Sequence, residues 1–203
     1  MNETESFENA ILVDADHVDK VAFNLIVNFE RMIGRRIPQA DMARWLDCVA
    51  LDGGVREKPQ TDGQDSNGQS THVVLIHDKG RACLENFVPG RYADELDGNA
   101  FRDHLGEFAI SALPVESLTT KDDFFIEALQ TLCVQQSVKR IMVIAADGLY
   151  GRVRDTLRRI DDDDKRITVF TMEPREGGNF RQEILGYSLM AALGIRGDEI
   201  KES

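Results

Sequence analysis

Short apolar runs alternate along the chain with longer segments whose apolar residues recur at helical spacing. Each run has about five to eight residues, the usual length of a strand buried in a sheet. Consecutive parallel strands must be joined by a crossover, and that crossover is usually a helix. The sequence therefore predicts an α/β fold of three layers, α/β/α, around a mostly parallel, Rossmann-like sheet of about five strands. The runs lie at residues 10–14, 72–78, 107–113, 140–147 and 167–172.

Two of these runs are apolar without polar alternation, which is typical of strands covered on both faces. We therefore expect 10–14 to lie at the centre of the sheet, beside 139–145. A chain of 203 residues fits one α/β domain, so we expect a single domain over 1–203, with a mobile loop at about 53–71. Helices are expected at 17–33, after Pro38, near 100–105, and at 121–134, 149–160 and 180–193.

The charge balance is acidic, with 36 Asp and Glu against 24 Lys and Arg and a formal net charge of −12. Nonspecific nucleic-acid binding depends on neutralising phosphates, so this balance argues against a large DNA-binding surface. It leaves room for a local basic groove. The chain has no apolar run long enough to cross a membrane and no apolar signal core at its N-terminus, so we expect a cytoplasmic protein with no membrane partner.

Carboxylates stand where several apolar runs end. Asp14 and Asp16 follow the first run, Asp147 ends the fourth, and Asp122 and Asp123 begin the helix after the third. The carboxyl ends of parallel strands meet at one edge of a sheet, which is where open α/β sheets bind ligands. Carboxylate oxygens are the ligands that Mg²⁺ and Mn²⁺ prefer. The pattern therefore predicts a divalent-metal site at this edge.

Each acid also has a purely structural interpretation. Asp16 is suited to capping the helix near residue 17, and Asp122 and Asp123 follow Thr120, a good N-cap, in a position that favours the helix dipole. Asp14 and Asp147 stand directly at strand ends and are harder to explain by capping alone. The sequence leaves the choice between metal ligand and cap open.

The order of these motifs resembles the NYN group of PIN-like metal-dependent ribonucleases. "ILVDADHV" corresponds to the group's first Asp-rich motif, "TKDDFFIEAL" to its Lys-containing motif, and "IMVIAADGLYGRVRDTLRRI" to the strand that ends in SGDxDF. Asp147 matches the first Asp of that last motif and Tyr150 matches its Phe. The chain departs from the pattern at Leu149, which replaces the second Asp, and at Asp122, which replaces the Gly of the Lys-containing motif.

The resemblance implies hydrolysis of RNA phosphodiesters, with Asp14, Asp147 and Lys121 as catalytic residues and single-stranded RNA as the substrate. It also implies Mg²⁺ or Mn²⁺, which we expect to be held by Asp14 and Asp147 together, with Asp16 and either Asp122 or Asp123 bound through water or from the surrounding shell. Loss of the acid at Leu149 makes a non-catalytic PIN-like interaction module a second hypothesis.

A third hypothesis comes from "DADHV", which matches the DxDx[TV] motif of haloacid-dehalogenase-like phosphatases with Asp14 as the nucleophile.

The first expected helix has an unusually wide apolar surface, since Phe23, Ile26 and Val27 extend it beyond one stripe. This width predicts a homodimer through the first or last helix, or cover by Met42 and Trp45 of the next helix.

Overall fold

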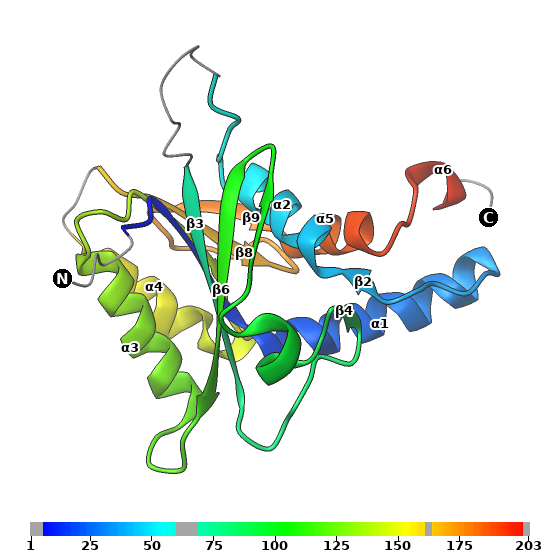
Figure 1. Ribbon diagram of the computed structural model, residues 1–203, viewed down its shortest axis with the longest axis horizontal. Helices are drawn as coiled ribbons and strands as arrows, with labels where there is room; N and C mark the ends of the chain where they lie inside the picture. Colours follow the sequence, from blue (N-terminus) through cyan, green and yellow to red (C-terminus); the bar gives the residue numbers. More distant parts are fainter. Residues whose placement is uncertain (1–5, 60–68, 161–163, 201–203) are drawn as a thin grey trace.

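A seven-stranded sheet forms the centre of the molecule (Figure 1), in a computed structural model that describes residues 6–59, 69–160 and 164–200. The strand order is β5-β6-β3-β1-β7-β8-β9. Every neighbouring pair is parallel except β5 and β6, so the predicted α/β fold with a mostly parallel sheet is confirmed. The strands are β1 (Asn9–Asp14), β3 (Ser70–Asp78), β5 (Ala100–Asp103), β6 (Gly106–Val115), β7 (Arg140–Ile144), β8 (Arg166–Thr171) and β9 (Arg181–Ile184).

Strand β1 is central, between β3 and β7, as its apolar sequence predicts. All six of its residues are buried, and they pair in register with both neighbours: Leu12 lies opposite Val74 on one side and Val143 on the other. A strand covered on both faces has no place for polar alternation. Because β1 ends at Asp14, its last side chain is a carboxylate at the margin of the core.

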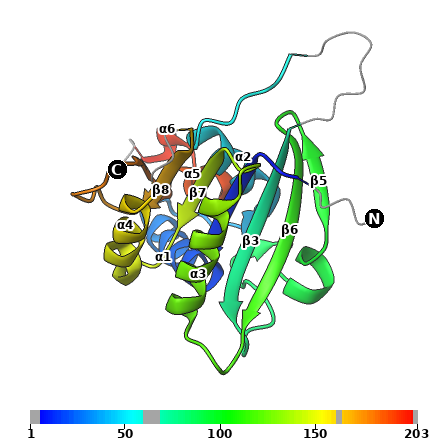
Figure 2. The ribbon, with the colours of Figure 1, turned by 90° about the vertical axis from the view of Figure 1, so that its left-hand side faces the viewer.

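The two faces of the sheet carry separate apolar cores. Ile11 and Val13 face helices α1 (Ala15–Ile33), α2 (Met42–Asp52) and α5 (Leu185–Ala192). Ala10 and Leu12 face α3 (Lys121–Val134) and α4 (Tyr150–Arg158). Figure 1 shows α3 and α4 on one side of the sheet and α1, α2 and α5 on the other, and Figure 2 views the molecule from the α3 and α4 side.

Two sequence expectations are wrong in detail. Residues 100–105 do not form a helix, since Ala100–Asp103 is β5, an antiparallel edge strand whose Phe101 ring stacks on Phe108 at 4.8 Å between centroids. The expected helix at 180–193 begins as β9, which pairs with β8, and becomes helical only at Leu185. Both segments are short edge strands, which lack the apolar run by which a central strand is recognised.

Smaller elements complete the fold. They are β2 (Ala40–Asp41) with β4 (Phe87–Val88), the π-helical turn η1 (Tyr92–Leu96), the 3₁₀ turn η2 (Asp147–Leu149) and α6 (Gly197–Ile200). Of the loop expected at 53–71, residues 53–59 and 69 are outside helices and strands, 70 and 71 belong to β3, and 60–68 lie outside the described residues. None of the helices in the described part of the chain is long and apolar enough to span a membrane.

The turn between β5 and β6 gives a test of this edge of the sheet. Gly106 has φ +105°, and a Cβ there would overlap the backbone oxygen of Gln69, which accepts a hydrogen bond from Glu107. We expect Gly106→Ala to lower the free energy of unfolding by about 3 kcal/mol, because it adds backbone strain and an overlap together. Gly148→Ala is the control, since a Cβ there meets nothing within 4 Å and its φ is not positive. Urea unfolding of both variants measures the difference, and equal midpoints would contradict this account of the turn.

Candidate functional site

Asp14 stands at the junction of β1 and α1 and does two things there. Its side chain is 2% exposed, and its Oδ1 accepts a hydrogen bond of 3.1 Å from the backbone N–H of His17, which makes Asp14 the N-cap of α1. The same Oδ1 lies 3.2 Å from Nζ of Lys121. Asp14 is therefore a helix cap, which is one of the two interpretations left open by the sequence, and it is also one half of an ion pair with Lys121.

Asp16, in the first turn of α1, turns back toward the ends of the neighbouring strands. Its Oδ2 accepts a hydrogen bond of 2.7 Å from the backbone N–H of Asp78, the last residue of β3, and lies 3.2 Å from Nζ of Lys121. Its Oδ1 is buried and accepts no hydrogen bond from the described residues, and Nε of Arg81 lies 3.8 Å away. Asp16 does not cap α1, because Asp14 already does.

Lys121 neutralises both carboxylates. It is the first residue of α3, held in place by Thr120, whose hydroxyl accepts a hydrogen bond from the backbone N–H of Asp123 and caps the helix. Burial alone would lower the pKa of Lys121, but Asp14 and Asp16 outweigh burial and raise its pKa above the ordinary value. The ammonium group is therefore charged at neutral pH. Asp14, Asp16 and Lys121 together form what we call the Asp-Lys-Asp cluster.

Tyr92 adds a buried hydroxyl to this neighbourhood that the sequence analysis missed. The residue is 3% exposed, its hydroxyl has no hydrogen-bond partner, and its ring stacks on His77 with 3.7 Å between centroids. Burial raises the pKa of Tyr92, and the charges of Asp16 and then Asp19 raise it further. Two orphaned oxygen atoms, on Asp16 and on Tyr92, thus lie within electrostatic reach of each other. No motif or spacing marks Tyr92, because it begins the short π-helical turn η1, which has no sequence pattern of its own.

Asp147 lies at the same edge of the sheet but is less enclosed. It begins η2 after β7, its side chain is 52% exposed, and its Oδ1 lies 3.8 Å from a guanidinium nitrogen of Arg175. Burial lowers the pKa of His17, and the charges of Asp14 and Asp147 both oppose that shift. Asp147 and Asp14 therefore act on the same imidazole from two neighbouring strands, although Asp147 makes no contact with Lys121 that would join it to the Asp-Lys-Asp cluster.

The remaining predicted ligands are further from the cluster's chemistry. Asp123 is exposed and forms an ion pair of 2.9 Å with Arg152, which together with Thr120 lowers its pKa. Asp122 is exposed in the first turn of α3. Leu149 is 2% exposed and belongs to the core under α3 and α4. The position where the NYN pattern has its second Asp is thus a packing position in this chain.

The side chains at this edge of the sheet are of the type that binds a divalent cation, but their oxygen atoms are not grouped as closely as the ligands of such an ion. Carboxylate oxygens with an orphaned member on Asp16 suit a hard cation that keeps several waters. Yet the described residues include a single group of three or more candidate ligand atoms within 4.8 Å of one another, Asp47, Asp103 and His104, and it lies elsewhere. There, Nε2 of His104 is 2.7 Å from Asp47, and that contact raises the pKa of His104, so an ion pair accounts for the group.

A hollow of about 310 Å³ opens beside Lys121. It is lined by the ends of β3 and β6 and the loop before α3, with Lys79 and Glu116 forming an ion pair of 2.8 Å at its margin. Beside Asp147 the space is far smaller, about 10 Å³, and is bordered by Tyr150 and Thr171. The larger of these two spaces therefore adjoins the cluster at Lys121.

Comparison with known proteins gives the chain a family and nothing more. No curated protein and no solved structure is significantly similar to it. Residues 3–200 match a family of unknown function, DUF6621, over almost the whole sequence. The chain that carries the Asp-Lys-Asp cluster is therefore a member of the DUF6621 family.

Proposed function

We propose that this protein is a divergent PIN-like protein of the NYN type, with a three-layer fold, that hydrolyses RNA phosphodiesters with the help of Mg²⁺ or Mn²⁺. One observation carries the proposal. The two acids of "DADHV" and the lysine of "TKDDFF" meet at the carboxyl end of the central strand, with Nζ of Lys121 3.2 Å from each carboxylate. The substrate class is taken from the resemblance, and the chemistry from the site.

The roles follow from the donors available. Asp14 and Asp147 would hold the ion, with Asp16 and either Asp122 or Asp123 bound to its waters. Such an ion supplies activation of water and stabilisation of charge on a phosphoryl centre. Lys121 lies at the mouth of the open hollow, where its ammonium can hold a phosphate oxygen. Arg175, 3.8 Å from Asp147 and 6.0 Å from the centroid of the Tyr150 ring, is a second cation at the same edge.

Two other functions compete with this one. A non-catalytic PIN-like module is favoured by Lys121, which already neutralises Asp14 and Asp16, and by the buried Leu149. A haloacid-dehalogenase-like phosphatase with Asp14 as the nucleophile has less support. Oδ1 of Asp14 is engaged as a helix cap, and α1 begins at Ala15, so no segment is left between β1 and the helix for the flap of such enzymes.

Exchange of Lys121 for an uncharged residue tests whether the cluster holds a metal. Lys121→Met leaves Asp14 and Asp16 close together without their cation, so we expect it to lower the free energy of unfolding by about 1–2 kcal/mol. Mn²⁺ should restore the melting temperature of Lys121→Met by more than it raises that of the wild type, because the ion takes over the charge of the ammonium. The control is Lys139→Met, an exposed lysine before β7. If Mn²⁺ changes the melting temperature of none of the three proteins, metal binding at the cluster is excluded.

Cleavage of single-stranded RNA with Mn²⁺ tests the chemistry. We expect Asp14→Asn and Asp147→Asn each to lower the rate at least about a hundredfold, because each removes a charged ligand. Asn is as good an N-cap as Asp, so Asp14→Asn keeps the start of α1 intact and separates the two roles of Asp14. Asp155→Asn is the control, since Asp155 is exposed on α4 and pairs with Arg154.

The alternatives give different results in the same experiments. Metal binding that both Asn variants abolish, without any RNA cleavage by the wild type, would identify the interaction module. Release of phosphate from a phosphomonoester, lost in Asp14→Asn and not in Asp147→Asn, would identify the phosphatase. Cleavage by Asp14→Asn at the wild-type rate contradicts the ribonuclease as proposed.

We also propose a homodimer through α1. Phe23 and Val27, one turn apart, are 53% and 36% exposed. Met42 and Trp45 are buried in the core that faces the sheet, and Trp45 packs edge-on against Phe87, so cover by α2 does not remove this exposure. Figure 1 shows the second half of α1 extending past the sheet.

Light scattering tests the dimer. The wild type should have the mass of two chains, and Phe23→Glu should have the mass of one with an unchanged fold, since a charge at the centre of an apolar contact opposes association. Leu118→Glu is the matched control, because Leu118 is a fully exposed apolar residue in a loop on another part of the surface. A wild-type monomer at high concentration would refute the dimer.

A further inference from the structure

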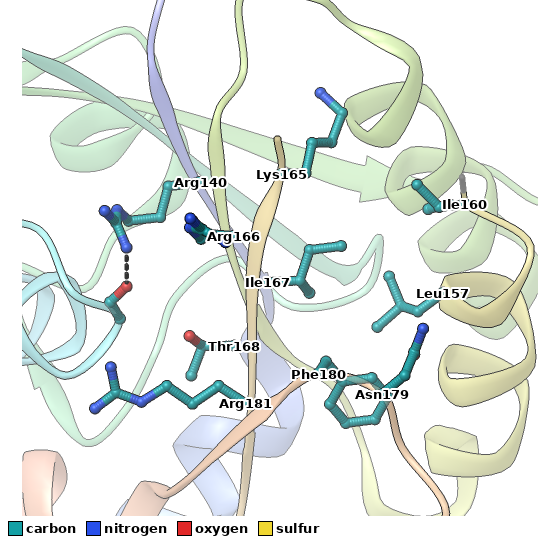
Figure 3. Close-up of a pocket in the computed structure, with 11 residues that line it drawn as sticks. Arg140, Leu157, Ile160, Lys165, Arg166, Ile167, Thr168, Asn179, Phe180 and Arg181 are labelled. Carbon is teal, nitrogen blue, oxygen red and sulfur yellow. Dashed lines mark hydrogen bonds between the residues drawn. The ribbon is translucent and has the colours of Figure 1, made fainter. Parts of the chain in front are cut away.

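A basic cavity of about 410 Å³ lies at the edge of the sheet opposite the Asp-Lys-Asp cluster. It forms where β7, β8 and β9 begin, whereas the cluster lies where β1 and β3 end. Figure 3 shows Arg140, Arg166 and Arg181 together on one side of the strand β8, with Thr168 between them. A volume of this size is in the range of small-molecule sites.

The sheet register brings these arginines together. Arg140 is the first residue of β7 and lies opposite Arg166, the first residue of β8. Arg181, the first residue of β9, lies opposite Thr168, which is two residues after Arg166 and so on the same face of the sheet. Three adjacent strands therefore each begin with an arginine that projects from the same face.

Among the described residues, one of the three arginines, Arg181, forms an ion pair with an acid, although acids outnumber bases 36 to 24 in this chain. Arg140 donates a hydrogen bond of 2.9 Å to the backbone oxygen of Gly53, and Arg181 is paired with Glu183 at 2.7 Å. No acidic side chain of the described residues forms an ion pair with Arg140 or Arg166. The arginines at this wall of the cavity are therefore only partly neutralised by the described acids.

The arginines also act on one another. Burial lowers the pKa of Arg140, and the charges of Arg166, Arg56 and Arg181 lower it further. Asp52 lies within electrostatic reach of Arg181 and Arg56, and burial raises its pKa. Within the described part of the chain, Asp52 and Glu183 therefore offset part of this positive charge.

Two consecutive glycines leave room for side chains of β7, Gly53 for Met142 and Gly54 for Arg140. Gly54 has φ +92°, and a Cβ there would lie 2.5 Å from a guanidinium nitrogen of Arg140. A Cβ on Gly53 would overlap the side chain of Met142. The sequence Asp-Gly-Gly after α2 thus lets the backbone approach the guanidinium closely and accept its hydrogen bond. This holds Arg140 at the cavity wall.

The other part of the cavity is apolar. Figure 3 shows Leu157, Ile160, Ile167 and Phe180 on the far side of β8 from the arginines. The strand β9 begins opposite Thr168, so it does not cover Arg166 and Ile167, and the cavity can pass around β8 at that point. Lys165 also lines it, but its Nζ already donates to the backbone oxygens of Gln135 and Val138.

We propose that this cavity binds a small phosphate-bearing molecule, with its phosphate at Arg140, Arg166 and Arg181 and an apolar part against Ile167 and Phe180. Arginine guanidinium groups match phosphate oxygens in pairs, and several converging arginines suit a group with more than one negative charge better than a single carboxylate. The inference does not depend on the proposed nuclease activity, because the cavity and the Asp-Lys-Asp cluster lie at opposite edges of the sheet.

Calorimetric titration of the full chain at low salt tests the site with three probes: pyrophosphate, AMP and citrate. We expect pyrophosphate and AMP to bind with a dissociation constant below about 1 mM, and citrate more weakly. Arg166→Gln should weaken both by about tenfold or more, because it removes charge-assisted hydrogen bonds. Phe180→Ala should weaken AMP and leave pyrophosphate unchanged. Arg102→Gln is the control, an exposed arginine on β5 that pairs with Glu107.

The melting temperatures of the variants are measured first, so that a loss of binding is not confused with a loss of folding. Arg166 is exposed, so its substitution by Gln should not disturb the fold. Loss of pyrophosphate binding in Arg166→Gln, with binding retained in Arg102→Gln, supports the site. The proposal is overturned if neither pyrophosphate nor AMP binds to the wild type. It is also overturned if Arg102→Gln weakens binding as much as Arg166→Gln does. Citrate that binds more tightly than pyrophosphate overturns the assignment to phosphate.

Discussion

The burial of β1 on both faces is the constraint on which the rest of the molecule depends. Its four apolar side chains, Ala10 to Val13, belong alternately to the two cores, so both helical layers pack against the same short strand. The buried carboxylate of Asp14 at the end of this strand needs polar partners. It accepts a hydrogen bond from the first turn of α1 and forms an ion pair with Lys121. The position of the Asp-Lys-Asp cluster follows from the packing of the core, since its first carboxylate is the end of the central strand.

The fold was predictable from the sequence to the extent that burial leaves a local pattern. The central strands are long apolar runs, and their order in the chain places Asp14, Asp16 and Lys121 at one edge. The edge strands β5 and β9 were missed because neither contains an apolar run, and each is defined by its pairing with one neighbouring strand, β5 with β6 and β9 with β8. Tyr92 was missed for a similar reason, since its contact with His77 joins segments whose spacing carries no signal.

The residues of the two charged regions occupy different positions relative to the strands. The acids of the Asp-Lys-Asp cluster lie at or just after the carboxyl end of β1, whereas Arg140, Arg166 and Arg181 are the first residues of β7, β8 and β9. A residue before a strand and a residue after it lie at opposite edges of a parallel sheet. The overall charge of −12 therefore conceals a group of arginines at the amino ends of β7, β8 and β9, at the opposite edge of the sheet from Asp14 and Asp16.

The cap that Asp14 provides has a mechanical consequence. Helix α1 has 19 residues and so a length of roughly 28 Å, which makes it a stiff rod. One end of the rod is fixed to the carboxylate edge through Asp14 and Asp16, and Arg35 just beyond its other end is tied to Glu199 of α6 by an ion pair of 2.7 Å. Two copies joined along the outer halves of their rods would hold their carboxylate edges at one set spacing and orientation. The length of α1 would then set the distance between the carboxylate edges of the two copies.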